Sequence, residues 1–160
     1  MSTQNKFEKI QTFRHNKANI VFFSPVTPVP LTVIKGASHA NLPLFPNENA
    51  ALGDILETKT KTKDGYFTSG FYRIVAGRSR PAEYSFEEAK LVLRGEIDIL
   101  DEATGRTIHA VPGDYIMFHV GSKVQFSTQS EGFAFYVVTR PGNNPHLTDR
   151  VEQASPKARL

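Results

Sequence analysis

A strand, a sharp turn and a returning strand are predicted by the stretch Pro112-Gly113-Asp114-Tyr115-Ile116-Met117-Phe118-His119-Val120-Gly121-Ser122-Lys123-Val124-Gln125-Phe126. Two glycines, Gly113 and Gly121, bracket an apolar run whose length suits one strand. Gly121 and Ser122 then turn the chain into a second run, in which apolar and polar residues alternate. The alternation predicts that this second strand has one buried face.

The rest of the chain repeats this pattern of short strands separated by glycine or proline. One hairpin is predicted over residues 52–76, with Asp64-Gly65 at its turn. A second is predicted over residues 97–111, and residues 133–139 supply the last strand. Near the N-terminus, Phe7, Ile10 and Phe13 are spaced to form one face of a short helix or an ordered arm. The pattern as a whole predicts an all-β sandwich or barrel.

Length and composition predict one domain with a single core, because 160 residues are too few for two comfortable domains. We expect an N-terminal arm over residues 1–22, a β-barrel over residues 23–141 and a C-terminal tail over residues 142–160. The absence of cysteine excludes disulfides, thiolate catalysis and zinc-cysteine sites. There is no apolar run of about 18 residues and no secretory signal, so we expect an intracellular protein without a membrane partner.

The charge distribution gives little support to nucleic-acid binding. The net charge is +3, but the lysines and arginines are scattered along the chain rather than clustered. The densest basic run, residues 59–63, alternates lysine and threonine, which predicts a solvated edge strand, with a phosphate-binding strip as the alternative. We therefore expect no nucleic-acid partner.

Two regions of the chain resemble the motifs of the cupin family. Gly113 and Gly121 fall on the two glycines of the second motif, G-x5-P-x-G-x2-H-x3-N, but Val124 stands where its metal-binding histidine is expected. In the first motif, G-x5-H-x-H-x3,4-E-x6-G, Glu88 and Gly95 match. Depending on the spacer, its two histidine positions fall on Ala82 and Tyr84 or on Pro81 and Glu83.

Within the cupins, the sequence is most similar to the EutQ-type ethanolamine-utilisation proteins. The similar runs are residues 84–88, 92–96, 113–114 and 121–126, and the resemblance covers residues 66–141. It implies a single cupin, or jelly-roll, β-barrel. It implies an activity less directly, because cupin barrels carry many chemistries.

Candidate catalytic residues follow from the alternation of side chains along the strand that carries the first motif. Residues two apart in a strand share a face, so Glu88, Lys90 and Val92 point the same way. The resemblance places Glu88 inside the barrel, which carries Lys90 inward beside it. Our hypothesis is that the Lys90 ammonium fills the electrostatic role of a cupin metal, while Glu88 is a general acid or base. The alternative is a buried structural ion pair, or a lysine whose head reaches solvent.

Two further residues could transfer protons. Tyr84 has the same parity as Glu88 and could bind a substrate oxygen or donate a proton, or it could be a core tyrosine. His119 is the histidine within the motifs and could be a proton shuttle, or an exposed turn residue. The candidate substrate-binding residues are Glu83, Arg73, Val124, Phe126 and Tyr136.

No cofactor is predicted, and the alternative is a divalent metal held by Glu83, Glu88 and His119. The function that fits these residues is a metal-independent isomerase, cyclase or lyase, such as a dehydratase, that acts on a small oxygenated substrate. The alternatives are a metal-dependent dioxygenase or metallo-lyase, an acetate kinase as the EutQ resemblance implies, and a non-catalytic small-molecule binding module.

Two expectations concern partners and location. A homodimer is expected through exposed apolar strands and the proline-rich segment. The residues Ala158-Arg159-Leu160 resemble the peroxisomal address Ser-Lys-Leu, which predicts recognition by a peroxisomal import receptor. The alternative is an ordinary tail on a cytoplasmic protein.

Overall fold

The computed structural model describes residues 10–12, 21–23, 33–44 and 47–142, and it divides into two compact units between Asn41 and Leu42. In the first unit, β1 (Ile10–Thr12) pairs antiparallel with β2 (Val21–Phe23), and the 3-10 turn η1 (Ala37–His39) follows. The short helix considered near the N-terminus is therefore wrong where the chain is described, since residues 10–12 form a strand. The expected domain boundaries stay predictions, and residues 158–160 lie outside the described part.

None of the helical segments among the described residues is long and apolar enough to cross a membrane.

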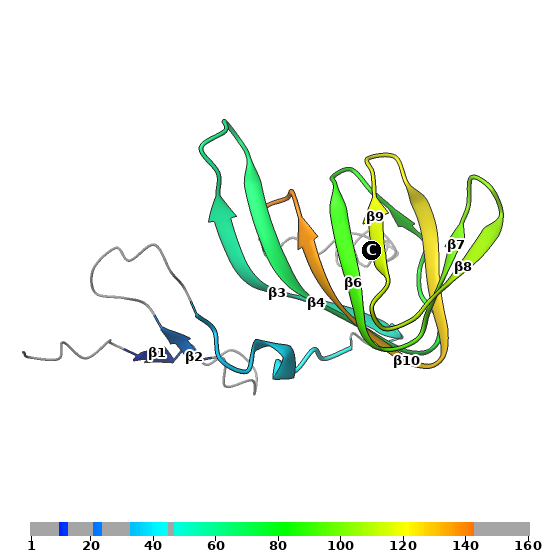
Figure 1. Ribbon diagram of the computed structural model, residues 1–160, viewed down its shortest axis with the longest axis horizontal. Helices are drawn as coiled ribbons and strands as arrows, with labels where there is room; N and C mark the ends of the chain where they lie inside the picture. Colours follow the sequence, from blue (N-terminus) through cyan, green and yellow to red (C-terminus); the bar gives the residue numbers. More distant parts are fainter. Residues whose placement is uncertain (1–9, 13–20, 24–32, 45–46, 143–160) are drawn as a thin grey trace, which may run out of the picture. The chain divides into compact units, whose positions relative to one another are not determined.

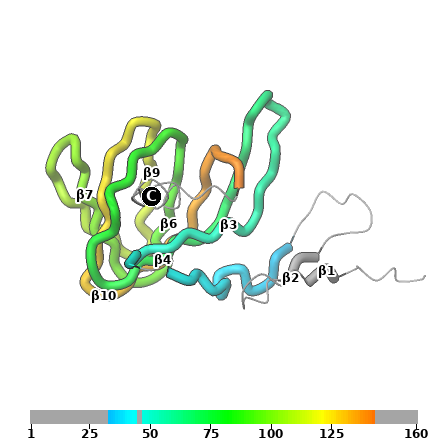
Figure 2. The backbone as a smooth tube through the Cα atoms, turned by 180° about the vertical axis from the view of Figure 1, so that it is seen from behind, coloured from blue at the N-terminus to red at the C-terminus, as the bar shows by residue number. Residues whose placement is uncertain are grey.

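The second unit is an eight-stranded antiparallel sheet that curls into a barrel (Figure 1). The central path runs β3-β4-β10-β6-β9, while β5 and β7 pair with β10, and β8 pairs with β7. The hairpin of β3 with β4 and strand β7 lie on opposite sides of the barrel (Figure 2). The all-β prediction is confirmed. The strands are β3 (Ala50–Lys59), β4 (Tyr66–Arg78), β5 (Ala82–Glu83), β6 (Glu88–Gly95), β7 (Ile97–Asp101), β8 (Arg106–Ala110), β9 (Tyr115–Phe118) and β10 (Lys123–Val138).

Strand β10 connects the two halves of the barrel. The sequence predicted two strands, over residues 124–128 and 133–139, but they form one strand with a bulge between Thr128 and Glu131. Gly132 does not end the strand. A Cβ there would lie 2.9 Å from the Glu96 carbonyl oxygen and 3.0 Å from Ile74 Cγ2, so glycine lets β10 pass closely between its neighbours.

The first hairpin is confirmed, but its turn begins earlier than predicted. Strand β3 ends at Lys59, and the Thr60 amide donates to the Gly65 carbonyl oxygen at 2.8 Å. Asp64 adopts a φ of 55°, a left-handed conformation that aspartate tolerates in turns. Residues 60–65 are therefore a loop, and the three lysines of residues 59–63 do not form one face of a strand.

The barrel interior is an aromatic and aliphatic core. Tyr84 stacks on Phe118 with ring centroids 4.6 Å apart, and Phe118 meets Phe126 edge to face at 5.7 Å. Tyr72 packs against Phe126 at 5.3 Å. Burial of these large rings is the main contribution to barrel stability, and it surrounds any polar group inside with apolar walls.

The outer face of the central sheet carries an apolar row that is exposed at one end. Phe71, Phe135, Leu91 and Tyr115 are successive partners across β4, β10, β6 and β9. Phe71 and Phe135 meet edge to face at 5.7 Å, whereas Leu91 and Tyr115 are exposed. An exposed apolar surface of this kind suits self-association. The homodimer itself stays a prediction, which light scattering of the full-length chain can test.

An exposed polar cluster lies on the hairpin of β7 and β8. Asp98 and His109 are cross-strand partners, and Asp98 Oδ1 lies 2.6 Å from His109 Nδ1. Glu96 Oε2 lies 3.8 Å from His109 Nε2. The hydrogen bond with Asp98, and the negative charges nearby, raise the pKa of His109 above its ordinary value of 6.5.

Asp98→Asn is expected to lower the pKa of His109, because it removes the charge that favours the imidazolium. Two-dimensional NMR titration of the imidazole measures this shift, and Glu102→Gln, an exposed change elsewhere on the chain, is the control. Because the folded pKa is raised, the contribution of His109 to stability is fully present below its unfolded pKa and is lost as the pH rises through the folded pKa. An unchanged titration midpoint in Asp98→Asn would contradict the assigned contact.

Candidate functional site

Strand β6 carries two charged residues into the barrel. As the alternation predicts, Glu88, Lys90 and Val92 lie on its inner face, and the exposed fractions of Glu88 and Lys90 are 0% and 2%. The sheet register pairs Glu88 with Phe118 on β9, and Lys90 with Tyr136 on β10. Both charges therefore lie in the aromatic interior, where an unpaired charge would be very unfavourable.

The two oxygens of the Glu88 carboxylate have different surroundings. Oε1 forms the ion pair with Lys90 Nζ and also accepts a hydrogen bond from the Tyr84 hydroxyl at 3.1 Å. Oε2 is buried and has no hydrogen-bond partner among the described residues. One oxygen is thus held by two donors, while the other remains able to accept a proton or a hydrogen bond.

The Lys90 ammonium lies among four aromatic rings. Nζ is 4.8 Å from the ring centroid of Tyr72 and 5.0 Å from that of Tyr136. It is 5.9 Å from the ring of Phe126 and 6.0 Å from that of Phe118. Burial lowers the pKa of Lys90, although the negative charge of Glu88 opposes this effect. The rings and Glu88 stabilise the ammonium, whereas burial, the larger effect, makes it release its proton more readily than an exposed lysine does.

Two tyrosines add phenol groups around Glu88. Burial raises the pKa of Tyr72, and the charge of Glu88 raises it further. Tyr84 is affected in the same direction and by the same two causes, in that order. Both phenols therefore keep their protons at neutral pH and are hydrogen-bond donors. The Tyr72 hydroxyl is buried without a hydrogen-bond partner among the described residues.

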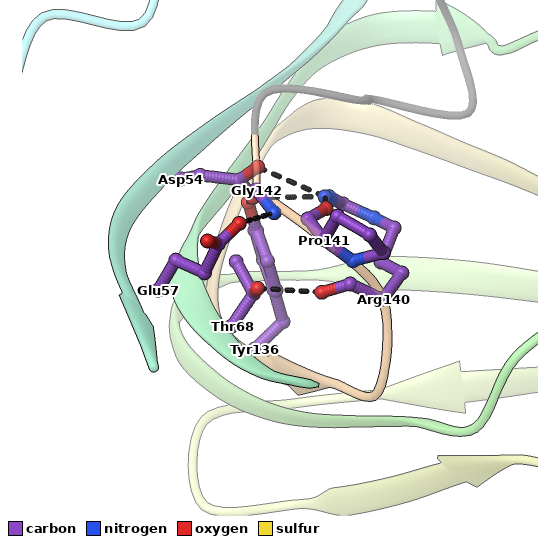
Figure 3. Close-up of polar contacts among 7 residues, drawn as sticks. All are labelled: Asp54, Glu57, Thr68, Tyr136, Arg140, Pro141 and Gly142. Atoms are coloured by element: carbon purple, nitrogen blue, oxygen red, sulfur yellow. Dashed lines mark hydrogen bonds and ion pairs between the residues drawn. The ribbon is translucent and has the colours of Figure 1, made fainter. Parts of the chain in front are cut away.

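A second ion pair joins Asp54, in the middle of β3, to Arg140, which follows the end of β10 (Figure 3). The Arg140 guanidinium donates to Asp54 through two bonds, Nη1 to Oδ2 at 2.9 Å and Nη2 to Oδ1 at 3.0 Å. The Tyr136 hydroxyl donates to Asp54 Oδ1, and the Thr68 hydroxyl donates to the Arg140 carbonyl oxygen at 2.6 Å. Burial disfavours the charge on Arg140, but the bonds to Asp54 outweigh it and raise its pKa.

Tyr136 links the two ion pairs. Its ring faces Lys90, its hydroxyl reaches Asp54, and burial followed by the bond to Asp54 raises its pKa. Gly70 makes this reach possible, because Asp54, Gly70 and Tyr136 are register partners across β3, β4 and β10. A Cβ on Gly70 would clash first with the Gly53 carbonyl oxygen, and it would lie 2.6 Å from the Tyr136 hydroxyl oxygen and 2.8 Å from Cζ. Because Gly70 has no side chain, the space that the Tyr136 ring needs to reach Asp54 stays open.

Gly70→Ala is expected to destabilise the fold by about 1–3 kcal/mol, the usual range for overpacking a well-packed interior. In an ordinary strand position, glycine to alanine would stabilise instead, so the sign is informative. Urea denaturation measures the free energy of unfolding, and Ser69→Ala, one residue away on the other face, should change it by less than about 0.5 kcal/mol. A stabilised Gly70→Ala variant would contradict the described path of Tyr136.

The other candidate residues separate into two groups. Val124 and Phe126 are buried in the same core as Tyr84. Arg73 follows Tyr72 on β4, so it has the opposite parity and lies, half-buried, away from the interior face. Arg73 therefore lies away from the interior, whereas Val124 and Phe126 lie within it, and substrate binding by all three residues stays a prediction.

His119 and Glu83 lie outside the interior site. The His119 side chain is 74% exposed, and its Nδ1 lies 3.0 Å from Glu87 Oε2. Glu83 is exposed and lies 3.6 Å from Lys123 Nζ. The preceding residue, Phe118, takes the inward position, which turns His119 outward. Within the described ranges, no three potential metal ligands gather, so Glu83, Glu88 and His119 do not form the considered metal site.

Asp54 and Arg140 are functional candidates that the sequence interpretation missed. Both lie within or beside predicted strands, but their partner depends on a register between β3 and β10 that the sequence does not state. A signal was present in Gly70, because a glycine inside a strand often marks a close approach by another group.

The family model for ethanolamine utilisation protein EutQ matches residues 69–144 of this chain. A search of curated protein sequences found no significant match.

Three solved structures share the fold. The ethanolamine utilization protein Q of Salmonella typhimurium has a TM-score of 0.58 at 24% identity, with 76% of this chain and 96% of that chain covered. EutQ of Clostridium difficile has a TM-score of 0.57 at 20% identity, with 73% of this chain and 88% of that chain covered. Ectoine synthase from P. lautus has a TM-score of 0.52 at 20% identity, with 69% of this chain and 75% of that chain covered. These likenesses confirm the predicted cupin barrel, and residues 69–144 of the chain are similar to EutQ.

Proposed function

We propose that this chain is a metal-independent enzyme that moves protons on a small oxygenated substrate inside the barrel, as an isomerase, a cyclase or a lyase. The observation that carries the proposal is the Glu88 carboxylate, with Oε1 held by Lys90 and Tyr84 and Oε2 buried without a partner among the described residues. The cupin fold also carries ectoine synthase, which supports an enzyme rather than a structural role.

The metal-independent part of the proposal rests on the donor chemistry at the motif positions. Where the cupin motifs place histidines, this chain has Ala82, Tyr84 and Val124, all of them buried. Alanine and valine offer no donor atom, and the Tyr84 hydroxyl is directed to Glu88. The positive charge at this place is the Lys90 ammonium, which can stabilise a developing oxyanion electrostatically.

Each residue has a distinct part in the proposed proton transfer. Glu88 Oε2 takes a proton from the substrate, since it is the oxygen that neither Lys90 nor Tyr84 occupies. Lys90 and the Tyr72 phenol donate hydrogen bonds to the oxygen on which negative charge develops. Tyr84 holds the carboxylate in position, and Val124 and Phe126 contribute to the apolar wall that excludes water.

Deuterium exchange tests this proposal without knowledge of the substrate. The full-length chain is incubated in D2O with a mixture of small metabolites, and mass spectrometry measures which compounds gain deuterium at carbon. Wild type should label one compound class, and Glu88→Gln should lower that labelling to near the rate in buffer. Compounds that bind but exchange no protons would instead favour the non-catalytic binding module.

A further inference from the structure

Three polar atoms of the Glu88–Lys90 pair and its neighbour Tyr72 lack hydrogen-bond partners among the described residues. They are Glu88 Oε2, the Tyr72 hydroxyl and Lys90 Nζ, which has only its ion pair with Glu88 Oε1. Each of the three residues is at least 98% buried. Buried polar groups in folded proteins are almost always hydrogen-bonded, so this set points to a bound molecule that completes the bonding.

The three atoms border the same part of the interior. Lys90 Nζ lies 4.8 Å from the Tyr72 ring centroid and forms its ion pair with the other oxygen of the same Glu88 carboxylate. Glu88 can only accept, while Tyr72 and Lys90 donate. A ligand that satisfies all three therefore carries a donor close to an acceptor oxygen, and that oxygen receives two hydrogen bonds, as a carbonyl oxygen can.

The charges of the interior select among such ligands. Glu88 and Lys90 cancel, as do Asp54 and Arg140, so the two ion pairs are balanced before anything binds. A ligand carboxylate would bring an uncompensated charge into this interior, which is unfavourable. A ligand ammonium at Glu88 Oε2 would lie close to the Lys90 ammonium and be repelled by it. A neutral hydroxyl group avoids both penalties as the donor.

We propose that the ligand is a neutral α-hydroxy carbonyl compound, a small hydroxy ketone or hydroxy aldehyde, which the site isomerises through an enediol. This inference rests on the proton-transfer function proposed above and specifies its substrate class. The hydroxyl group donates to Glu88 Oε2, and the carbonyl oxygen accepts from Lys90 and Tyr72. The carbon that bears the hydroxyl then lies next to the base.

The proton and electron movements balance without a co-reactant. Glu88 Oε2 takes the proton from the hydroxyl-bearing carbon, the C–H electron pair forms the carbon–carbon double bond, and the carbonyl π pair moves to its oxygen. Lys90 gives that oxygen a proton, which yields the enediol. Glu88 then returns its proton to the former carbonyl carbon, and Lys90 regains a proton from the other oxygen. One carbon is oxidised and its neighbour reduced by the same amount.

The test uses the full-length chain in D2O with four probes. Hydroxyacetone and dihydroxyacetone are the neutral hydroxy ketones, lactate is the hydroxy acid and alanine is the zwitterion. Proton NMR measures the exchange of carbon-bound hydrogen above the rate in buffer. Only the two hydroxy ketones should exchange. Tyr72→Phe, which removes a single hydroxyl, should lower that exchange by about 10²-fold, the usual loss for one oxyanion donor. Tyr115→Phe, at a 66% exposed tyrosine, is the matched control.

The outcomes separate this inference from the function on which it rests. Exchange of lactate or alanine alone would overturn the substrate class and leave the proton-transfer function standing. Saturation-transfer NMR that shows hydroxyacetone bound without exchange would overturn proton transfer on this ligand, and the isomerase with it. Neither binding nor exchange of the hydroxy ketones would also overturn the inference. The comparison among probes uses wild-type protein, so it holds even where Tyr72→Phe fails to fold.

Discussion

Glu88→Gln and Lys90→Met are each expected to lower turnover by about 10²–10⁴-fold per folded molecule, the range for loss of general acid-base catalysis, and the double variant should not recover it. Glutamine keeps the size of Glu88 and can still accept the Tyr84 hydroxyl bond, but it cannot take a proton. Methionine approximates the lysine stem without its ammonium. The measurements are the exchange rate in D2O and the free energy of unfolding in urea, each made on the two single variants and the double variant.

A purely structural ion pair would differ in the double variant, where activity would return together with stability. Each single variant would then lose about 3–5 kcal/mol of stability, because one buried charge would be left without its partner, and the double variant would recover much of that loss. Activity would follow stability. The catalytic role of Glu88 and Lys90 would be contradicted if the double variant regained both the stability and the activity that the single variants lose.

The chain contains a matched control for this comparison. Glu83 and Lys123 form an acid–lysine pair at 3.6 Å whose side chains are 59% and 55% exposed. Glu83→Gln and Lys123→Met should each change the free energy of unfolding by less than about 1 kcal/mol, since exposed pairs contribute little. If variants of both pairs lost similar amounts of unfolding free energy, burial of Glu88 and Lys90 would not be the cause of the loss.

The pH dependence of Glu88→Gln gives a further check. Burial already lowers the pKa of Lys90 below 10.5, and removal of Glu88 takes away the charge that opposes this effect. Between its folded pKa and 10.5, Lys90 is then protonated in the unfolded chain and neutral in the folded one. Stability of the variant should therefore rise with pH across this window.

Arg140→Met is expected to destabilise the fold by about 3–5 kcal/mol, because it leaves the nearly buried Asp54 carboxylate with the Tyr136 hydroxyl but without its cation. Asp54→Asn should also destabilise, since it leaves the Arg140 guanidinium charged in the same place. The double variant Asp54→Asn/Arg140→Met should recover part of the loss. Urea denaturation measures the free energy of unfolding of the three variants. The difference between the loss in the double variant and the sum of the two single losses gives the interaction energy of Asp54 with Arg140.

Arg140→Lys separates charge from geometry in this pair. Lysine keeps the positive charge but cannot make the two parallel bonds from Nη1 and Nη2 to the Asp54 oxygens. An intermediate loss of stability is expected. A lysine variant as stable as wild type would show that the two-bond geometry does not contribute, and a methionine variant as stable as wild type would contradict the assigned role of the pair.

Strand parity, together with the family resemblance that places Glu88 inside the barrel, was sufficient to predict the interior positions of Glu88 and Lys90. Their side chains alternate with outward residues, and one anchor residue fixes the facing of the whole strand. Parity fails at turns, which is why His119 could not be oriented until Phe118 was seen to take the inward position. It also fails across a bulge, and β10 was therefore divided into two strands at Gly132.

Asp54 and Arg140 could not be paired from the sequence because their contact depends on long-range register. They are 86 residues apart and meet only because β3 and β10 lie on either side of β4. A bulge between Asp54 and Leu56 further shifts the register there. The alternation of apolar and polar residues along a strand predicts neither which strands pair nor where a bulge occurs.

The position of β10 along the chain has a consequence for biosynthesis. It is the last strand in the described sequence, and it pairs with β4, β5, β6 and β7, all of which are made before it. The hairpins of β3 with β4 and of β7 with β8 can form as they leave the ribosome, because their contacts are local. The barrel cannot close around Glu88 and Lys90 until residues 123–138 have emerged. During translation the interior aromatic residues therefore remain accessible to chaperones, and the ion pair forms only after the final strand is released.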